Sequence, residues 1–176
     1  MTEQDLARLV KNLIDSQWTI ATAESCTAGL IASTLADQPG AGGLLDCAFV
    51  TYSPQAKYRC LGVDQAVLAA NNLTSEAVAR AMAKGAAELT PANLIIANTG
   101  VADDTAAPRI PAGTQCYAWL FKPRDPFDPL VVYTETIAFD GSREEIRRQS
   151  ADYAILRIEH WLQMLKQERQ GLSPGV

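Results

Sequence analysis

The sequence predicts an α/β fold: a single three-layer domain with a mixed β-sheet flanked by helices. Segments with apolar residues at helical spacing alternate with short apolar runs along the 176 residues, and this alternation is typical of layered α/β proteins. The length fits one domain that buries its own core without disulfides or metals. We assign residues 1–168 to this domain and expect residues 169–176 to form a disordered tail.

The first half of the chain predicts two strands and several helices. Residues 3–15 show helical apolar spacing, and Thr2 with Asp5 approximates a capping box at their start. The expected strands are the short apolar runs 18–23 and 47–52. Further helices are expected at residues 28–35, from Pro54 onward, at 64–70 and at 76–89.

The second half contributes the strands that make the sheet mixed. A third strand is expected at residues 93–98. The β-rich segments 115–121 and 130–139 are neighbours in the chain and can pair across a proline-containing turn, which predicts antiparallel strands beside parallel ones. Ser142 is expected to cap a last helix that ends near Gln167.

The composition excludes several classes of protein. The formal net charge is -5, and an acidic chain without a basic run is unsuited to nucleic acid or an anionic membrane. No segment approaches the roughly 18 apolar residues of a membrane span, and the polar start lacks the features of a signal peptide, so we expect a cytoplasmic protein. The four cysteines are widely spaced and there is one histidine, so we predict no metal site and no cofactor.

Ser25 is the first candidate for chemistry, because it follows a predicted strand on a tight turn into a predicted helix. A hydroxyl there lies near the free N–H groups of a helix start, which can stabilise an oxyanion. Ala28 and Gly29 are small enough to let a ligand approach the backbone. The alternative is that Ser25 only caps the helix.

A nucleophilic serine needs a base, and the sequence offers few. The single histidine, His160, lies near the end of the last helix, and a Ser-x-x-Lys motif is absent because Ala28 follows Ser25 by three residues. Lys57, with Tyr52, lies where a strand ends and a helix begins. A partly buried lysine has a lowered pKa and can act as a base. The alternative for Lys57 is a solvated helix residue.

Two further segments are candidates for binding a ligand. Asn98-Thr99-Gly100 follows the third predicted strand, at the carboxyl end where ligands of α/β folds bind. The alternative is that this segment is a plain turn. Arg143 and Arg147 lie one turn apart on the last helix and could clamp a phosphate. They could equally pair with acidic residues of the surface.

Together these segments resemble the CinA C-terminal domain family, the family of the nicotinamide-nucleotide amidases. The resemblance spans about residues 5–165, and its motifs keep the same order. The matching stretches are Ala23-Glu24-Ser25-Cys26-Thr27-Ala28-Gly29, Phe49-Val50-Thr51-Tyr52-Ser53 with Lys57, Leu61-Gly62-Val63, Thr74-Ser75-Glu76-Ala77-Val78-Ala79 with Met82 and Gly85, Thr99-Gly100-Val101-Ala102, Pro111-Ala112-Gly113-Thr114, and Phe139-Asp140-Gly141-Ser142-Arg143 with Arg147.

The resemblance implies an activity and a role for each matching residue. The family's amidases hydrolyse nicotinamide mononucleotide to nicotinic acid mononucleotide and ammonia. Ser25 would be the nucleophile, and Lys57, helped by Tyr52, would activate it. Backbone N–H groups after Ser25 would hold the oxyanion. The residues implied to bind the substrate are Cys26, Thr27, Ala28, Gly29, Gly42, Thr99, Gly100, Arg143 and Arg147. The resemblance also implies a homo-oligomer.

The chain departs from the family pattern at three places. Ala28 replaces a glycine, Gly42 stands where the family usually has a serine, and the glycine-rich stretch of the loop is rewritten with Asp103 and Asp104. If these carboxylates face the site they repel a phosphate, although Arg109 could pair with one of them; otherwise both face water. We therefore expect the nucleotide to bind poorly and an uncharged or cationic amide, such as the riboside, to bind better.

Three kinds of function follow from the sequence. The first is a metal-free serine amidohydrolase acting on a small amide or nucleotide. The second is a paralogue that has lost turnover and binds a pyridine nucleotide or a related small molecule. The third is a folded subunit whose role is interaction alone. Neither nucleic acid nor a membrane is an expected partner.

Overall fold

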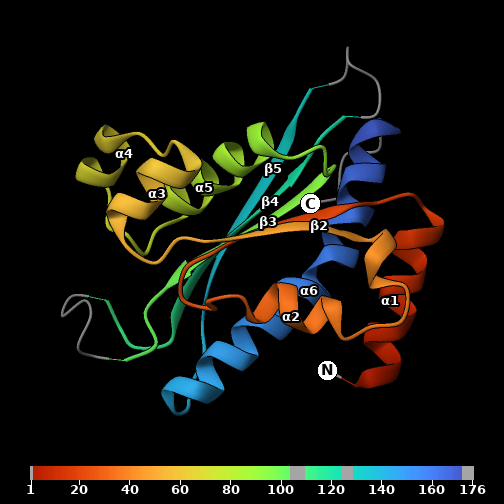
Figure 1. The fold of residues 1–176 in the computed structure, drawn as a ribbon, viewed down its shortest axis with the longest axis horizontal. Coiled ribbons are helices and arrows are strands. Elements are labelled where there is room, and N and C mark those ends of the chain that lie inside the picture. Colours follow the sequence, from red (N-terminus) through yellow and green to blue (C-terminus); the bar gives the residue numbers. More distant parts are fainter. Residues whose placement is uncertain (1, 104–109, 124–128, 172–176) are drawn as a thin grey trace.

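The computed structural model describes residues 2–103, 110–123 and 129–171, and in these residues it confirms the α/β class (Figure 1). The helices are α1 (Glu3–Asp15), α2 (Leu30–Ala36), α3 (Pro54–Leu61), α4 (Gln65–Ala70), α5 (Glu76–Leu89) and α6 (Arg143–Arg169), with a short 3-10 helix at Ala41–Gly43. The strands are β1 (Ile20–Glu24), β2 (Leu45–Val50), β3 (Leu94–Gly100), β4 (Thr114–Phe121) and β5 (Val131–Ala138).

The five strands form one mixed sheet in the order β2-β1-β3-β4-β5. Strand β1 lies parallel to both β2 and β3, whereas β4 is antiparallel to β3 and to β5. At the end of β1, Glu24 stands opposite Val50 of β2 and Asn98 of β3. The carboxyl ends of three parallel strands therefore meet at one edge of the sheet, where ligands of α/β proteins bind.

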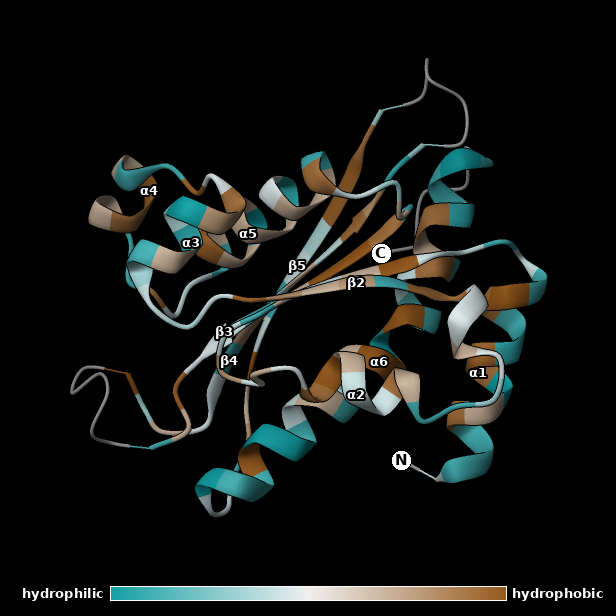
Figure 2. Cartoon of the chain, viewed as in Figure 1, coloured by the Kyte–Doolittle hydropathy of each residue, from teal (hydrophilic) through white to brown (hydrophobic). Residues whose placement is uncertain are grey.

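Helices cover both faces of the sheet, which makes three layers (Figure 1). Helices α1, α2 and α6 pack on one face around a core that includes Leu13, Ile31 and Trp119. Helix α5 packs on the other face, with α3 and α4 against it, around a core that includes Met82 and Ile95. Figure 2 shows the apolar residues concentrated along the strands. None of the helices in the described residues has the length and apolar character that a membrane span requires.

The element boundaries differ from the predicted ones mainly next to the candidate site. Helix α2 begins at Leu30 rather than at 28, because Ala28 and Gly29 both have positive φ angles, 51° and 93°, which a right-handed helix cannot contain. Strand β3 extends to Gly100, so Thr99 and Gly100 lie on the strand and not in a turn after it. Helix α6 continues to Arg169, two residues past the end predicted near Gln167. Residues 172–176 lie outside the described residues, and the disordered tail stays a prediction.

Candidate active site

A pocket of about 410 Å³ lies where the carboxyl ends of β1, β2 and β3 meet. Three segments of the chain line it besides the strand ends: the start of α3, the loop before α5 and the start of α6. The lining residues are Ser25, Cys26, Tyr52, Lys57, Asn72, Leu73, Thr74, Thr99, Gly100, Val101, Ala102 and Arg143. Seven of the site residues predicted from the sequence therefore line one cavity: Ser25, Cys26, Tyr52, Lys57, Thr99, Gly100 and Arg143.

Lys57 and Ser25 contact each other in this pocket, as the sequence predicted. The Lys57 ammonium donates a hydrogen bond to Ser25 Oγ at 2.8 Å, although 32 residues separate the two in the chain. It also donates to the carbonyl oxygens of Thr51 at 2.7 Å and Tyr52 at 3.3 Å. Helix α3 places the lysine there because Ser53 accepts a hydrogen bond from Ala56 N–H and so fixes the helix start directly after β2.

The environment of Lys57 favours its neutral form. Only 1% of the residue is exposed, and no carboxylate within the described residues pairs with it. Burial lowers the pKa of Lys57 from an ordinary value of 10.5 to about 8. A lysine that loses its proton near pH 8 can accept the proton of a neighbouring hydroxyl. The alternative of a solvated Lys57 is therefore wrong.

Ser25 does not cap helix α2. The helix begins five residues later, with Gly29 at the cap position, and its first N–H groups are satisfied by Glu24 instead. The buried Glu24 carboxylate accepts hydrogen bonds from the N–H groups of Gly29 at 2.7 Å, Ile31 at 3.2 Å and Ala32 at 3.0 Å. Ser25 Oγ is thus left to face Lys57.

The peptide groups after Ser25 are held from two sides. Asn98 accepts from Ser25 N–H through its carbonyl oxygen at 3.0 Å and from Thr27 N–H through Oδ1 at 3.2 Å. Arg147 donates to the carbonyl oxygens of Cys26 at 2.9 Å and Thr27 at 3.0 Å. Ala28 N–H donates to Ser25 O at 3.1 Å.

One backbone donor of this turn stays without an acceptor among the described residues, the N–H of Cys26. The sequence predicted several N–H groups after Ser25 as oxyanion donors. The N–H groups of Thr27, Ala28 and Gly29 already have protein acceptors, so only that of Cys26 remains as a candidate among the described residues. Cys26 lines the pocket beside Ser25, where a developing oxyanion would lie.

The Cys26 thiol is a poor competitor for the role of nucleophile. It is 4% exposed and accepts a hydrogen bond from Gln115 Nε2 at 3.4 Å. Burial raises the pKa of this thiol, and only the thiolate is strongly nucleophilic. The buried Gln115 also approaches Gly100 so closely that a Cβ there would lie 2.2 Å from Gln115 Oε1. A side chain at position 100 would therefore displace the Gln115 amide from its hydrogen bonds with Asn98, Val101 and Ser150.

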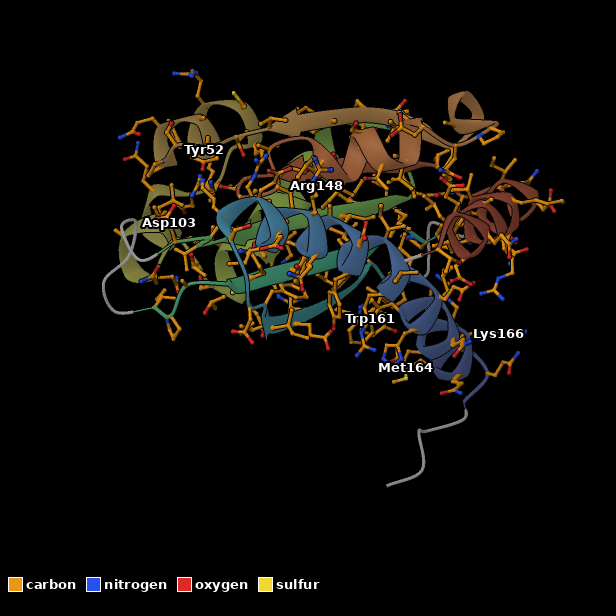
Figure 3. The ribbon with its side chains drawn as sticks, turned by 90° about the horizontal axis from the view of Figure 1, so that it is seen from below. Tyr52, Asp103, Arg148, Trp161, Met164 and Lys166 are labelled. Carbon is orange, nitrogen blue, oxygen red and sulfur yellow. The ribbon has the colours of Figure 1, made fainter. Side chains whose placement is uncertain are left out.

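Tyr52 and Arg143 form the mouth of the pocket. Tyr52 is 56% exposed, and its hydroxyl accepts a hydrogen bond from Arg143 Nη2 at 2.7 Å. Arg143 Nη1 pairs with the carboxylate of Asp103. Figure 3 shows Tyr52 and Asp103 at the same end of the molecule, far from Lys166 at the other end of α6. Tyr52 thus contacts Lys57 through its carbonyl oxygen, whereas its phenol contacts Arg143. The expected help of Tyr52 in catalysis stays a prediction.

The rewritten loop beside the pocket mouth is described only in part. Asp103 belongs to the described residues, whereas Asp104 and Arg109 lie outside them. The expected weak binding of the nucleotide stays a prediction.

Several predicted substrate-binding residues lie outside the pocket. Arg147 instead donates to the carbonyl oxygens of Cys26 and Thr27 in the turn after Ser25. Thr27, Ala28 and Gly29 shape that turn without lining the cavity. Gly42 belongs to the 3-10 helix at the amino end of the sheet, just before Leu44, whose carbonyl oxygen accepts from Ile20 N–H at the start of β1. It therefore lies at the opposite end of β1 from Ser25.

Sequence reasoning missed two parts of the site. Glu24 is absent from the predicted site residues, although a glutamate in a fully buried five-residue strand indicates a carboxylate with internal partners. The pocket wall at Asn72 and Leu73 had no sequence signal, and Thr74 beside them was matched to the family without a role in the site. Thr99 Oγ1 holds this wall by donating to Leu73 O at 2.8 Å.

A larger hollow of about 610 Å³ lies between α1 and α6, lined in part by Arg8, Trp18 and Lys166. We place the chemistry in the smaller pocket, because it contains the buried lysine–serine pair. The sequence also predicted that the single histidine is not the base for Ser25. His160 packs edge-on against Trp161, which Figure 3 labels on the half of α6 away from Tyr52. No cluster of metal-ligating side chains is found in the described residues.

Comparison with known proteins decides the family. The model of the CinA C-terminal domain matches residues 3–162. This chain belongs to the CinA C-terminal domain family. A CinA-like protein of Chlorobium chlorochromatii is 40% identical over 159 residues, which cover 90% of this chain and 36% of the relative. A CinA-like protein of Mycobacterium tuberculosis is 42% identical over 137 residues, which cover 77% of this chain and 30% of the relative.

Solved structures of the CinA family share the fold. The competence damage-inducible protein A from Klebsiella pneumoniae superposes with a TM-score of 0.82 at 31% identity, covering 90% of this chain and 95% of that one. The competence/damage inducible protein CihA from Agrobacterium tumefaciens gives 0.77 at 28% identity, covering 91% and 97%. The chain spans less than two fifths of the curated CinA relatives named above. Its homo-oligomeric state and cytoplasmic location stay predictions.

Ala28, one of the departures from the CinA pattern, has a strained backbone conformation three residues after Ser25. Its φ of 51° is left-handed, which costs a non-glycine residue about 1–2 kcal/mol. Because glycine also has more conformational freedom to lose on folding, we expect Ala28→Gly to raise the free energy of unfolding by up to about 1 kcal/mol. Ala7→Gly, in the exposed middle of α1, should lower it by about 0.5–1 kcal/mol. Urea denaturation measures both variants. A fall in the free energy of unfolding for Ala28→Gly, like that expected for Ala7→Gly, would refute the strain at Ala28.

Proposed function

We propose that this chain is an amidohydrolase in which Ser25 is the nucleophile and Lys57 the general base, acting on the carboxamide of a nicotinamide nucleotide or a close relative. The observation that carries the proposal is the 2.8 Å contact between Lys57 Nζ and Ser25 Oγ inside the pocket. A serine hydroxyl is a weak nucleophile until a base takes its proton. A lysine with a lowered pKa can serve as that base. The resemblance to the nicotinamide-nucleotide amidases supplies the substrate class.

The reaction follows as two acyl-transfer steps. The neutral Lys57 amine takes the proton of Ser25 Oγ, which attacks the carbonyl carbon of the carboxamide. The oxyanion of the tetrahedral intermediate accepts a hydrogen bond from Cys26 N–H. Lys57 then gives its proton to the departing nitrogen, and ammonia leaves. Lys57 then takes a proton from water, which attacks the acyl-Ser25 ester. As the ester bond breaks, Lys57 returns this proton to Ser25 Oγ, and the carboxylic acid product leaves and ionises.

The direct test is Ser25→Ala, with ammonia release from nicotinamide mononucleotide and from nicotinamide riboside as the measurement. We expect turnover to fall to background, because no other described hydroxyl contacts Lys57. The free energy of unfolding should change by about 1 kcal/mol or less, since one hydrogen bond is lost and no helix cap is removed. Ser33→Ala, an exposed serine of α2, is the matched control and should keep full activity.

Acid-quenched mass spectrometry provides a second readout for the same variant. The wild type should carry an acyl group on the peptide that contains Ser25, and Ser25→Ala should not. Turnover retained by Ser25→Ala would refute the assignment of the nucleophile. A wild type that binds one of the two ligands but releases no ammonia would favour the alternative of a binding protein that has lost turnover.

A further inference from the structure

A buried polar network lies next to the turn that carries Ser25. Its members are Asn98 of β3, Gln115 and Tyr117 of β4 and Ser150 of α6, and each of the four is 0% exposed. None of them lines the pocket, and the reaction proposed above assigns them no role. Burying four polar side chains costs stability unless each finds partners. Here the partners lead to the turn after Ser25.

Asn98 holds this turn through two acceptors. Its carbonyl oxygen accepts from Ser25 N–H at 3.0 Å, and its side-chain Oδ1 accepts from Thr27 N–H at 3.2 Å. The N–H of Cys26, the candidate oxyanion donor, lies in the chain between these two held groups. The first contact is made by main-chain atoms and survives any substitution of Asn98. The second contact depends on the Asn98 side chain.

The orientation of the Asn98 amide is fixed by the rest of the network. Asn98 Nδ2 donates to Gln115 Oε1 at 3.1 Å and to Ser150 Oγ at 3.3 Å. Both protons of Nδ2 are therefore used, and Oδ1 is left to face Thr27 N–H. An amide turned by 180° would place its NH₂ group against the N–H of Thr27 and its oxygen against Gln115 Oε1. The network therefore permits one orientation.

Gln115 joins the turn to a second wall of the pocket. Its Nε2 donates to Cys26 Sγ at 3.4 Å and to the carbonyl oxygen of Val101 at 3.0 Å, and both of these residues line the pocket. Its Oε1 accepts from Asn98 and from Ser150 Oγ at 3.2 Å. The amide that orients Asn98 is thus itself held by two pocket-lining residues.

We propose that Asn98, oriented by Gln115, is a positioning residue that keeps the Cys26 N–H where the oxyanion of the acyl-transfer step develops. This inference rests on the proposed amidase function and assigns a role to residues outside the pocket. Loss of an oxyanion donor costs about 10²- to 10³-fold in kcat. A displaced donor loses part of this effect, and because the donor acts in the transition state, the loss falls on kcat and not on KM.

Asn98→Leu removes the amide and keeps about the same side-chain volume. We expect kcat for ammonia release from nicotinamide mononucleotide or nicotinamide riboside to fall about tenfold to a hundredfold, with KM changed by less than about threefold. Gln115→Met removes the group that orients Asn98 and should lower kcat about tenfold. It carries the test if Asn98→Leu does not fold.

Tyr117→Phe is the matched control, because it removes a hydroxyl at the outer end of the same network. That hydroxyl contacts Ser150 at 2.7 Å and no group of the turn. The variant should lower the melting temperature, as loss of a buried hydrogen bond does, while kcat stays within about threefold of the wild type. If Asn98→Leu and Gln115→Met also keep kcat within this range, or if Tyr117→Phe lowers it as much as they do, the network contributes stability alone and the positioning role is overturned.

Phenylmethanesulfonyl fluoride provides a readout that does not depend on the amide substrate. Ser25 Oγ bonds to the sulfur, Lys57 takes the hydroxyl proton and fluoride leaves, while a sulfonyl oxygen takes the place of the oxyanion. Mass spectrometry of the intact protein should show a sulfonyl group on the wild type and none on Ser25→Ala. Asn98→Leu should lower the rate constant of labelling about tenfold.

The two readouts separate this inference from the amidase proposal. Where ammonia is released, kcat decides the positioning role, and a kcat that depends on Ser25 but is unchanged in Asn98→Leu and Gln115→Met overturns that role and leaves the amidase standing. Labelling that depends on Ser25 and Asn98, without ammonia release from either compound, overturns the amidase and leaves the positioning role. A wild type that neither releases ammonia nor is labelled overturns both.

Discussion

Lys57→Met should lower the rate constant of amide hydrolysis by about 10²- to 10⁴-fold, the range expected for loss of a general base. Methionine keeps the length and apolar stem of lysine but cannot take the proton of Ser25. Lys84→Met, on the exposed face of α5, is the matched control and should keep wild-type activity. A rate within about threefold of the wild type would exclude Lys57 as the base.

The same lysine sets the expected pH dependence. Because burial lowers the pKa of Lys57 to about 8, the neutral amine is the minor form at pH 7 and the major form at pH 9. The rate should therefore rise with pH through about 8 and then level off. The measurement is kcat/KM for ammonia release between pH 6 and pH 10 in buffers of constant ionic strength. A flat profile over this range would count against Lys57.

Stability should rise with pH as activity does, but over a higher pH range. The pKa of Lys57 is lower in the folded than in the unfolded chain, so the unfolded chain binds more protons between about pH 8 and 10.5. Burying the charged amine lowers the free energy of unfolding by about 3 kcal/mol, as follows from the difference between the two pKa values. This loss is complete below pH 8 and disappears as the pH rises to 10.5. Wild-type stability should gain from this rise, and Lys57→Met, which carries no such charge, should not show the gain.

The contact between Lys57 and Ser25 could be predicted because both residues follow strands. Residues at the carboxyl ends of neighbouring parallel strands meet at one edge, whatever their separation in the chain. Because the sequence offers no other usable base, few pairs of nucleophile and base remained to be considered. The alternation of elements likewise fixed the three layers, and the cap at Ser142 fixed the start of α6.

The partners of individual side chains could not be predicted in the same way. Arg143 and Arg147 have the same chemistry and lie one helical turn apart, but one reaches Tyr52 and the other reaches carbonyl oxygens of the nucleophile turn. Which carbonyl oxygens need a donor depends on the local backbone path, here on the left-handed Ala28. The position of Gly42 depends on the direction of β2 and not on its distance from Ser25 in the sequence.

Glu24, the last residue of β1, should contribute more to stability than any polar side chain of the turn that follows it. Its buried carboxylate accepts from three backbone N–H groups at the start of α2, and from Thr22 Oγ1 at 2.9 Å. A negative charge at a helix start is further favoured by the helix dipole. Glu24→Gln replaces one of the two acceptor oxygens by a donor, so that buried N–H groups lose their partner.

We expect Glu24→Gln to lower the free energy of unfolding by about 3 kcal/mol, the cost of a lost charge-assisted hydrogen bond together with an unsatisfied buried donor. Thr22→Val is the matched control, because it removes only the hydroxyl partner of the carboxylate; it should cost about 1 kcal/mol. Denaturation by urea at pH 7 measures both variants. A loss for Glu24→Gln no larger than that for Thr22→Val would mean that the carboxylate is not what anchors the turn carrying Ser25.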